Sequence, residues 1–127
     1  MKINHIALYV NNLEQMKAFY EKYFNAKSNK MYHNKNTGLK TYFLEFNNGC
    51  RIEIMTRDNL NNVKKETNNT GYIHIAFSVG SKDTVDELTK RIENAGYKII
   101  SQPRITGDGY YESCVIDPEN NQIEIVE

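Results

Sequence analysis

The sequence has little of what several classes of protein depend on. Its 127 residues include two cysteines, two prolines and no tryptophan. Cys50 and Cys114 lie far apart and match no metal-binding or redox spacing, and we expect both to pack in core strands. A chain of this length buries roughly two thirds of its unfolded surface, so one stable domain needs no disulfide.

An excess of charge of one sign is also missing. The chain has 16 basic and 16 acidic side chains, and no basic run exceeds two residues. This argues against nucleic acid or a polybasic membrane anchor as a partner. Apolar runs are short, so no transmembrane helix is expected, and Asn4 and His5 break the N-terminal run that a signal peptide would need. The cytoplasm is the expected location.

An internal repeat organises what is present. Residues 5–10 read HIALYV and residues 74–79 read HIAFSV, while residues 52–55 read IEIM and residues 123–126 read IEIV. The two histidines are 69 positions apart and the two glutamates 71 positions apart. Two matches in the same order and nearly the same register indicate that one module is used twice.

Apolar periodicity predicts the order βαβββ in each module. In the first, a helix is expected near 12–24, capped by Asn11 or Asn12. The strands expected there lie near 2–10, 27–33, 39–46 and 49–56. In the second, a helix is expected near 82–95, between a Ser81 cap and Gly96. The strands expected there lie near 72–80, 97–101, 110–116 and 122–126.

The domain assignment follows from these elements. A single domain over 1–127 is expected, with one module near 1–57, a polar connector at 58–71 and a second module near 72–127. The turn at 117–121 contains Asn120, a residue type that tolerates a left-handed backbone.

Four ionisable residues share one position relative to the strand faces. Because strand side chains alternate, His5, Glu53, His74 and Glu124 all oppose apolar neighbours. Singly, such a histidine is usually hydrogen-bonded or half-exposed, and such a glutamate usually faces solvent. The repeat places the pair twice, so two imidazoles and two carboxylates converge if the modules pack about a pseudo-twofold axis. Carboxylates held together need a cation, and a divalent metal site is therefore predicted.

The sequence resembles the vicinal oxygen chelate superfamily over essentially the whole chain. The resemblance rests on the segments at 5–10, 52–55 and 74–79 and on GDGYYESCVIDPENNQIEIVE at 107–127. That superfamily includes glyoxalase I, bleomycin-resistance proteins and extradiol dioxygenases. The resemblance implies an α+β fold in which two βαβββ modules form a half-open eight-stranded barrel around a metal.

Glyoxalase I proteins use His, Glu, His and Glu as metal ligands, matched here by His5, Glu53, His74 and Glu124. Extradiol dioxygenases and fosfomycin-resistance enzymes have a His, His and Glu ligand pattern with no equivalent of Glu53. Methylmalonyl-CoA epimerases have Gln in the place of Glu53. Glu53 therefore favours a glyoxalase I-like lyase or isomerase acting on a 2-oxoaldehyde–thiol adduct or related carbonyl. The resemblance implies a metal-stabilised enediolate, with Glu124 moving the proton and Glu53 assisting. Zinc or nickel suits the ligands best, and manganese or iron is also compatible.

Two positions depart from the glyoxalase I pattern. Arg57 stands where those proteins usually carry an asparagine that contacts glutathione. Thr70 stands where they often carry an arginine. Both differences argue against glutathione as the thiol. His33 lies in a polar segment and is expected to be solvated. Weaker candidates for the substrate pocket are Tyr9, Arg51, Met55, Tyr72 and Tyr110.

Other functions remain open at this point. The chain could bind and sequester a drug or metabolite as a resistance protein, with or without a metal, or it could be an epimerase or thiol transferase on the same scaffold. A homodimer is expected because a half-open barrel leaves strand edges to cover. The two modules that share a site could belong to one chain or to two.

Overall fold

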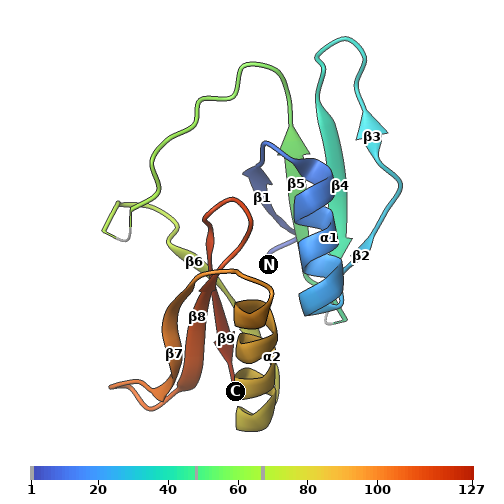
Figure 1. Ribbon diagram of the computed structural model, residues 1–127. Helices are drawn as coiled ribbons and strands as arrows, with labels where there is room; N and C mark the ends of the chain where they lie inside the picture. The colour runs from blue at the N-terminus through green and yellow to red at the C-terminus, as the bar shows by residue number, and fades with distance from the viewer. Residues whose placement is uncertain (1, 48, 67) are drawn as a thin grey trace. The chain divides into compact units, whose positions relative to one another are not determined.

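The computed structural model describes residues 2–47, 49–66 and 68–127, so Met1, Asn48 and Thr67, the last within the predicted connector, lie outside it. The chain divides into two compact units, Met1–Val63 and Lys64–Glu127. Each unit pairs one helix with one curved mixed sheet (Figure 1). The predicted α+β fold of two βαβββ modules is confirmed.

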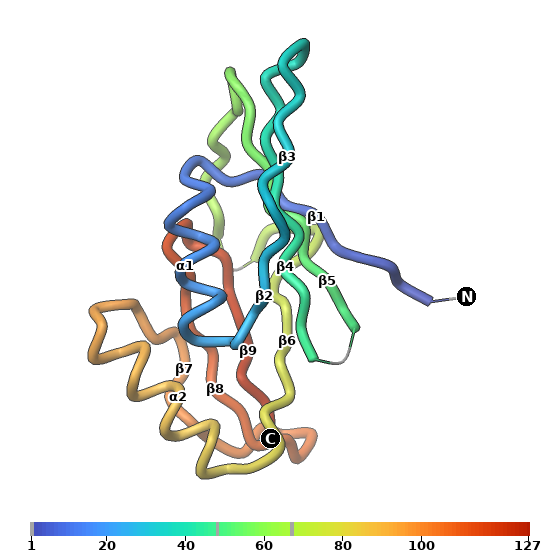
Figure 2. Tube along the Cα trace, turned by 90° about the vertical axis from the view of Figure 1, so that its right-hand side faces the viewer, coloured from blue at the N-terminus to red at the C-terminus, as the bar shows by residue number. Residues whose placement is uncertain are grey.

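The first unit is a sheet with one covering helix. Its helix is α1 (Leu13–Phe24). Its strands are β1 (Ile6–Tyr9), β2 (Lys27–Ser28), β3 (Tyr32–His33), β4 (Lys40–Glu45) and β5 (Arg51–Thr56). The sheet order is β1-β5-β4-β2, with β3 also paired to β4; only β1 and β5 run parallel. Figures 1 and 2 show α1 along one side of these strands.

Helix α1 forms where the sequence signals it. The Asn12 side chain accepts a hydrogen bond from the Gln15 backbone N–H at 3.0 Å, which satisfies one of the free donors of the first turn. Asn25 ends the helix in the left-handed conformation, with φ of 53°. The helix buries one stripe against β4 and β5. The buried residues are Leu13, Met16, Phe19, Tyr20, Tyr23 and Phe24.

The second unit repeats this arrangement. Its helix is α2 (Lys82–Asn94). Its strands are β6 (His74–Ser78), β7 (Ile99–Ile105), β8 (Tyr111–Ile116) and β9 (Gln122–Val126). The sheet order is β6-β9-β8-β7, and β6 and β9 form the only parallel pair among these strands. Ser81 caps α2 as predicted, accepting from the Thr84 backbone N–H at 3.1 Å.

The turn between β8 and β9 contains one residue in the left-handed conformation. Asn120 adopts φ of 64°, the left-handed conformation predicted for it. The buried Asp117 carboxylate accepts from the backbone N–H groups of Glu119 and Asn121 at 2.9 and 2.8 Å. This turn fixes how far β9 is offset from β8 along the sheet.

Several predicted strand ends are wrong, because strands end where their partners end. The first strand begins at Ile6 rather than residue 2, since β5 begins at Arg51 and Ile6 is paired with Ile52. The strand predicted at 72–80 shortens to β6 for the same reason. The predicted strand at 27–33 splits into β2 and β3, which pair with opposite ends of β4, so the fold has nine strands within the described chain.

The largest shift is in β7, predicted at 97–101 and found at Ile99–Ile105. The strand continues through Pro103 because it is the outermost strand of its sheet, where a missing N–H is tolerated. Its register against β8 shifts twice, between Ile99 and Ser101 and between Ser101 and Arg104.

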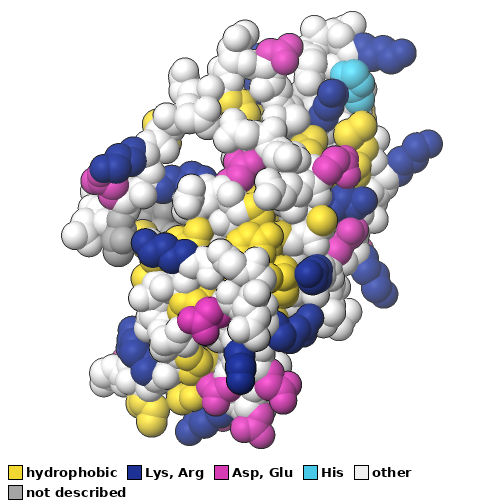
Figure 3. Space-filling model, in the orientation of Figure 1, with side chains coloured by type: hydrophobic (Ala, Val, Ile, Leu, Met, Phe, Trp, Pro, Cys, Tyr) yellow, Lys and Arg dark blue, Asp and Glu magenta, His cyan; other side chains and the backbone are white. Residues whose placement is uncertain are grey.

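The exposure of charged, cysteine and histidine side chains agrees with the predictions except at Cys50. On the face drawn in Figure 3, Lys and Arg are interspersed with Asp and Glu. Cys114 is buried in β8, as predicted, but Cys50 is exposed before β5, so its predicted core position is wrong. His33 is exposed. Neither α1 nor α2 is long and apolar enough to cross a membrane, nor is any other helix in the described part of the chain.

Candidate metal centre

The first unit brings His5 and Glu53 together. Glu53 lies on β5 directly opposite Ala7 of the parallel strand β1, and His5 is two residues before Ala7 on the same face. The His5 Nε2 and Glu53 Oε2 atoms are 3.5 Å apart. The histidine side chain is 35% exposed and the glutamate side chain 17% exposed, so both remain accessible to a ligand.

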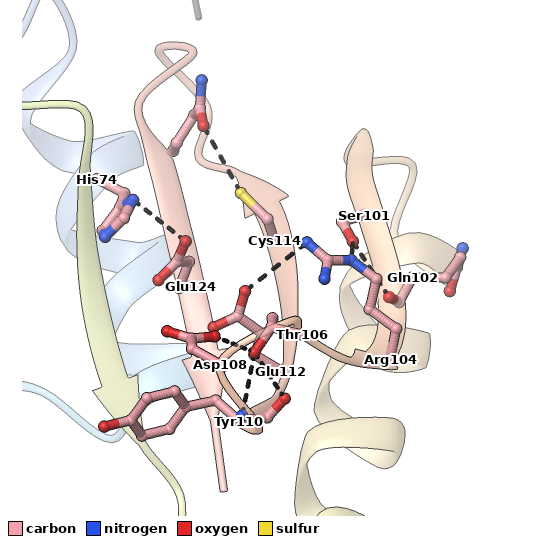
Figure 4. A network of polar contacts seen from close by, with 11 residues as sticks. His74, Ser101, Gln102, Arg104, Thr106, Asp108, Tyr110, Glu112, Cys114 and Glu124 are labelled. Atoms are coloured by element: carbon pink, nitrogen blue, oxygen red, sulfur yellow. Dashed lines mark hydrogen bonds and ion pairs between the residues drawn. The ribbon is translucent and has the colours of Figure 1, made fainter.

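The second unit repeats this placement with different atoms. Glu124 on β9 lies opposite Ala76 of the parallel strand β6, and His74 is two residues before Ala76. Here the Nδ1 atom of His74 faces Glu124 Oε1, at 3.2 Å, and the two side chains are 35% and 21% exposed (Figure 4). The predicted repeat of the His–Glu pair therefore exists in the structure, one pair in each unit.

Each pair has the spacing of two metal ligands. Two donor atoms about 2.0–2.1 Å from a zinc ion at the tetrahedral angle lie about 3.4 Å apart, close to the 3.5 and 3.2 Å found. An imidazole nitrogen and a carboxylate oxygen also suit zinc, nickel and manganese. A pair supplies only two donors, and no group of three or more His, Cys, Asp and Glu able to hold a metal is present among residues 2–47, 49–66 and 68–127. One pair fits half of a metal site.

An aromatic side chain and a basic side chain lie beside the His5–Glu53 pair. The Phe43 ring on β4, opposite Glu53, packs perpendicular to the His5 ring, with centroids 5.2 Å apart. The Arg51 guanidinium lies over the same Phe43 ring at 4.8 Å and donates to the Asn4 side-chain oxygen. Phe43 and Asn4 were not among the site residues predicted from the sequence. Alternation along β4 could have placed Phe43 on this face, but only the register of β4 against β5 puts it beside Glu53.

A second polar group lies beside Glu124. Glu112 of β8 is 3.9 Å from Arg104 of β7, and Arg104 also donates to Ser101 at 2.8 Å (Figure 4). Cys114, directly opposite Glu124, donates a weak hydrogen bond to Gln122 at 3.8 Å. Arg104 and Glu112 were not predicted as site residues. The strand predicted at 97–101 ended before Arg104, so the pairing of Arg104 with Glu112 could not be anticipated.

Burial raises the pKa of Glu124 and of Cys114, the residue directly opposite it. Burial raises the pKa of the Cys114 thiol to about 11, with the Glu124 and Glu112 carboxylates adding to the effect. Cys114 is therefore a protonated thiol at neutral pH, and neither a nucleophile nor a thiolate ligand. Burial also raises the pKa of Glu124; His74 and Arg104 lower it in part, while Glu112 and Asp108 raise it further.

The weaker predicted pocket residues are dispersed. Arg51 and Met55 share the β5 face of Glu53 and are half-buried. Tyr9 ends β1 and is 49% exposed, whereas Tyr72 and Tyr110 lie outside the strands and are fully and 59% exposed. A polar cavity of about 370 Å³ in the first unit contains none of the predicted site residues; Lys40, Thr56 and Arg57 are among the residues that line it.

The chain belongs to the glyoxalase/bleomycin resistance protein/dioxygenase superfamily, whose family model matches residues 2–125. Among curated proteins it is 25% identical to the uncharacterized protein YqjT of Bacillus subtilis, over 98% of this chain and 97% of YqjT.

Solved structures of the same family superpose on the chain. A glyoxalase I mutant from Zea mays matches with a TM-score of 0.81 and 20% identity, covering 98% of this chain and 44% of the maize chain. A mutant of the fosfomycin resistance protein FosX from Listeria monocytogenes matches with a TM-score of 0.72 and 28% identity, over 98% of this chain and 90% of FosX. That FosX structure is complexed with Mn(II) and 1S,2S-dihydroxypropylphosphonic acid.

Proposed function

We propose that the chain is a metal-dependent lyase or isomerase of glyoxalase I type, acting on a small 2-oxoaldehyde–thiol adduct or a related carbonyl compound. The supporting observation is that a His–Glu pair occurs in both modules at the same register and with metal-ligand spacing. In this proposal His5, Glu53, His74 and Glu124 supply four donors to one divalent ion, from one chain or from two. The two carboxylates would match the ion's charge.

A divalent ion bound there would supply a Lewis acid that polarises the substrate carbonyl. His5 and His74 would serve as neutral ligands, and Glu53 would serve as a carboxylate ligand and could assist. Glu124 is the proposed proton carrier. Burial raises its pKa, which makes its carboxylate a stronger base than an exposed glutamate. It would take a proton from the carbon beside the carbonyl and return it to the neighbouring carbon.

Metal content and turnover together test this function. Protein purified without chelator should hold about one divalent ion per four-ligand site, and it should isomerise adducts of methylglyoxal with one of several thiols. Glu124→Gln should lower kcat at least about 100-fold when metal is supplied, since removing a general base costs about that much. Glu112→Gln is the matched control: it removes a carboxylate from the same sheet face without removing a proposed ligand. Absence of bound metal, together with an unchanged melting temperature in Glu124→Ala, would contradict the proposal.

A resistance protein for a phosphonate antibiotic is the second candidate. The 28% identity to FosX favours it, and the Arg51 guanidinium beside the His5–Glu53 pair would suit a phosphonate. Chemical conversion of fosfomycin, monitored by ³¹P NMR with Mn²⁺ present, would establish this activity. Binding of fosfomycin without any change in its spectrum would instead indicate sequestration.

A further inference from the structure

The two His–Glu pairs differ in which ring nitrogen faces the carboxylate. In the first module it is Nε2 of His5, and in the second it is Nδ1 of His74. The strand registers are otherwise equivalent, because Ala7 opposes Glu53 as Ala76 opposes Glu124. Something in the first module therefore orients the imidazole differently.

In the first module a chain of hydrogen bonds leads from Arg51 through Asn4 to His5. The Arg51 guanidinium can only donate, so the Asn4 atom that meets it must be the side-chain oxygen. That oxygen lies 2.8 Å from Nδ1 of His5, so Nδ1 must carry the proton. In a neutral ring the Nε2 atom then carries the lone pair, and that lone pair faces Glu53 Oε2. Two acceptors in contact call for a proton or a metal ion between them.

Phe43 holds both ends of this chain in place. The Arg51 guanidinium lies over its ring at 4.8 Å, and the His5 ring packs perpendicular to it at an interplanar angle of 88°. A cation over an aromatic face is stabilised, and perpendicular rings are a favoured arrangement.

The second module offers none of these groups at the equivalent positions. The strand registers align Asn4 with Ile73, Arg51 with Gln122 and Phe43 with Cys114. The difference in ring orientation thus coincides with three differences in sequence.

We propose that Asn4, oriented by Arg51, is a positioning residue that fixes the Nδ1–H form of His5 and so presents its Nε2 atom as a metal ligand beside Glu53. The metal part of this statement rests on the proposed function; the part about the proton on His5 does not. Replacing a residue that hydrogen-bonds a metal ligand in this way typically weakens metal affinity about 10–100-fold.

The first test reads the proton directly in metal-free protein. Chain labelled with ¹⁵N-histidine is examined by long-range ¹H–¹⁵N correlation at about pH 8.5, above the ordinary titration range of imidazole. His5 should be in the Nδ1–H form in the wild type and in Asn4→Asp, which keeps an oxygen acceptor. In Asn4→Leu it should move toward the Nε2–H form, and in Arg51→Gln, which copies the second module, it should move partly. His33 and His74 serve as internal controls and should not change.

The second test measures Zn²⁺ affinity by competition with a chelator. Asn4→Leu should bind Zn²⁺ about 10–100-fold more weakly than the wild type, and Asn4→Asp at least as tightly. Unchanged melting temperatures of the metal-free variants would exclude a folding defect. A wild-type His5 in the Nε2–H form, or an Asn4→Leu chain with unchanged tautomer and affinity, would overturn the proposal. A wild type that binds no metal yet shows the expected tautomers would refute the proposed function and leave the role of Asn4 standing.

Discussion

Glu124 is the proposed site residue whose ionisation the fold changes in a direction that matters for stability. Burial, the largest cause, raises its pKa above the ordinary value of 4.5. The native state therefore binds this proton more tightly than the unfolded state does. The resulting stabilisation is fully present below the unfolded pKa and is lost as the pH rises through the folded pKa. The ionised carboxylate thus destabilises the metal-free native state at neutral pH.

We expect Glu124→Gln to raise the free energy of unfolding of chelator-treated protein at about pH 7 and to leave it nearly unchanged at about pH 4. Urea denaturation over this pH range measures the difference. Glu87→Gln, which removes an exposed carboxylate from α2, is the control and should show no such trend. A Gln variant that is less stable at pH 7 would mean that attraction from His74 and Arg104 outweighs burial.

At the scale of elements, one buried pair of hydroxyls joins α2 to β8. Thr89 Oγ1 donates to the Val85 carbonyl at 2.6 Å, so it must accept from Ser113 Oγ, also at 2.6 Å. Thr89 is 1% exposed and Ser113 is fully buried. A buried donor that loses its acceptor costs more than the bond itself contributes.

Thr89→Val should therefore destabilise the protein by about 1–3 kcal/mol, because it leaves the Ser113 hydroxyl unsatisfied. The double variant Thr89→Val with Ser113→Ala should recover most of this loss, since no polar group is then stranded. Chemical denaturation of the wild type, both single variants and the double variant measures the coupling energy. Additive effects of the two substitutions would show that the hydroxyl pair does not join the two elements.

At the scale of the whole molecule, a module is present twice and each copy has its own core. Within each unit, the helix covers one sheet face, and the face with the His–Glu pair is the other. Each sheet ends in outer strands, β1 and β2 in one and β6 and β7 in the other. On β7, Ile100 and Ile105 are 41% and 66% exposed. Such edges are commonly covered by association.

We expect a homodimer, with a mass by light scattering near twice the chain mass of 14.8 kDa. A monomer at micromolar concentration would contradict this expectation. Mixing also tests which chain supplies each pair. A variant lacking His5 and Glu53 is refolded together with one lacking His74 and Glu124. Restored Zn²⁺ binding would assign the halves of a site to different chains, and no restoration would assign both to one chain.

Much of the fold could be predicted from local patterns. Helical spacing and caps located α1 and α2 to within a residue, because Asn12 and Ser81 satisfy helix donors that lie next to them in the chain. Alternation along strands placed His5, Glu53, His74 and Glu124 each on the face opposite its apolar neighbours, because the period of two assigns faces without knowledge of neighbouring strands. Strand ends were less predictable, as β7 shows, because they depend on the length of a distant partner.

The sequence by itself determined the duplicated module, the types of its elements and the sheet face that carries each His–Glu pair, since all three follow from short-range periodicity and self-similarity. Only the tertiary structure decided that Phe43 lies beside His5, that Asn4 meets Arg51 and that Cys50 is exposed. These contacts depend on the register between strands that are far apart in the chain. A shift of one residue in that register would turn every side chain of a strand to the opposite face.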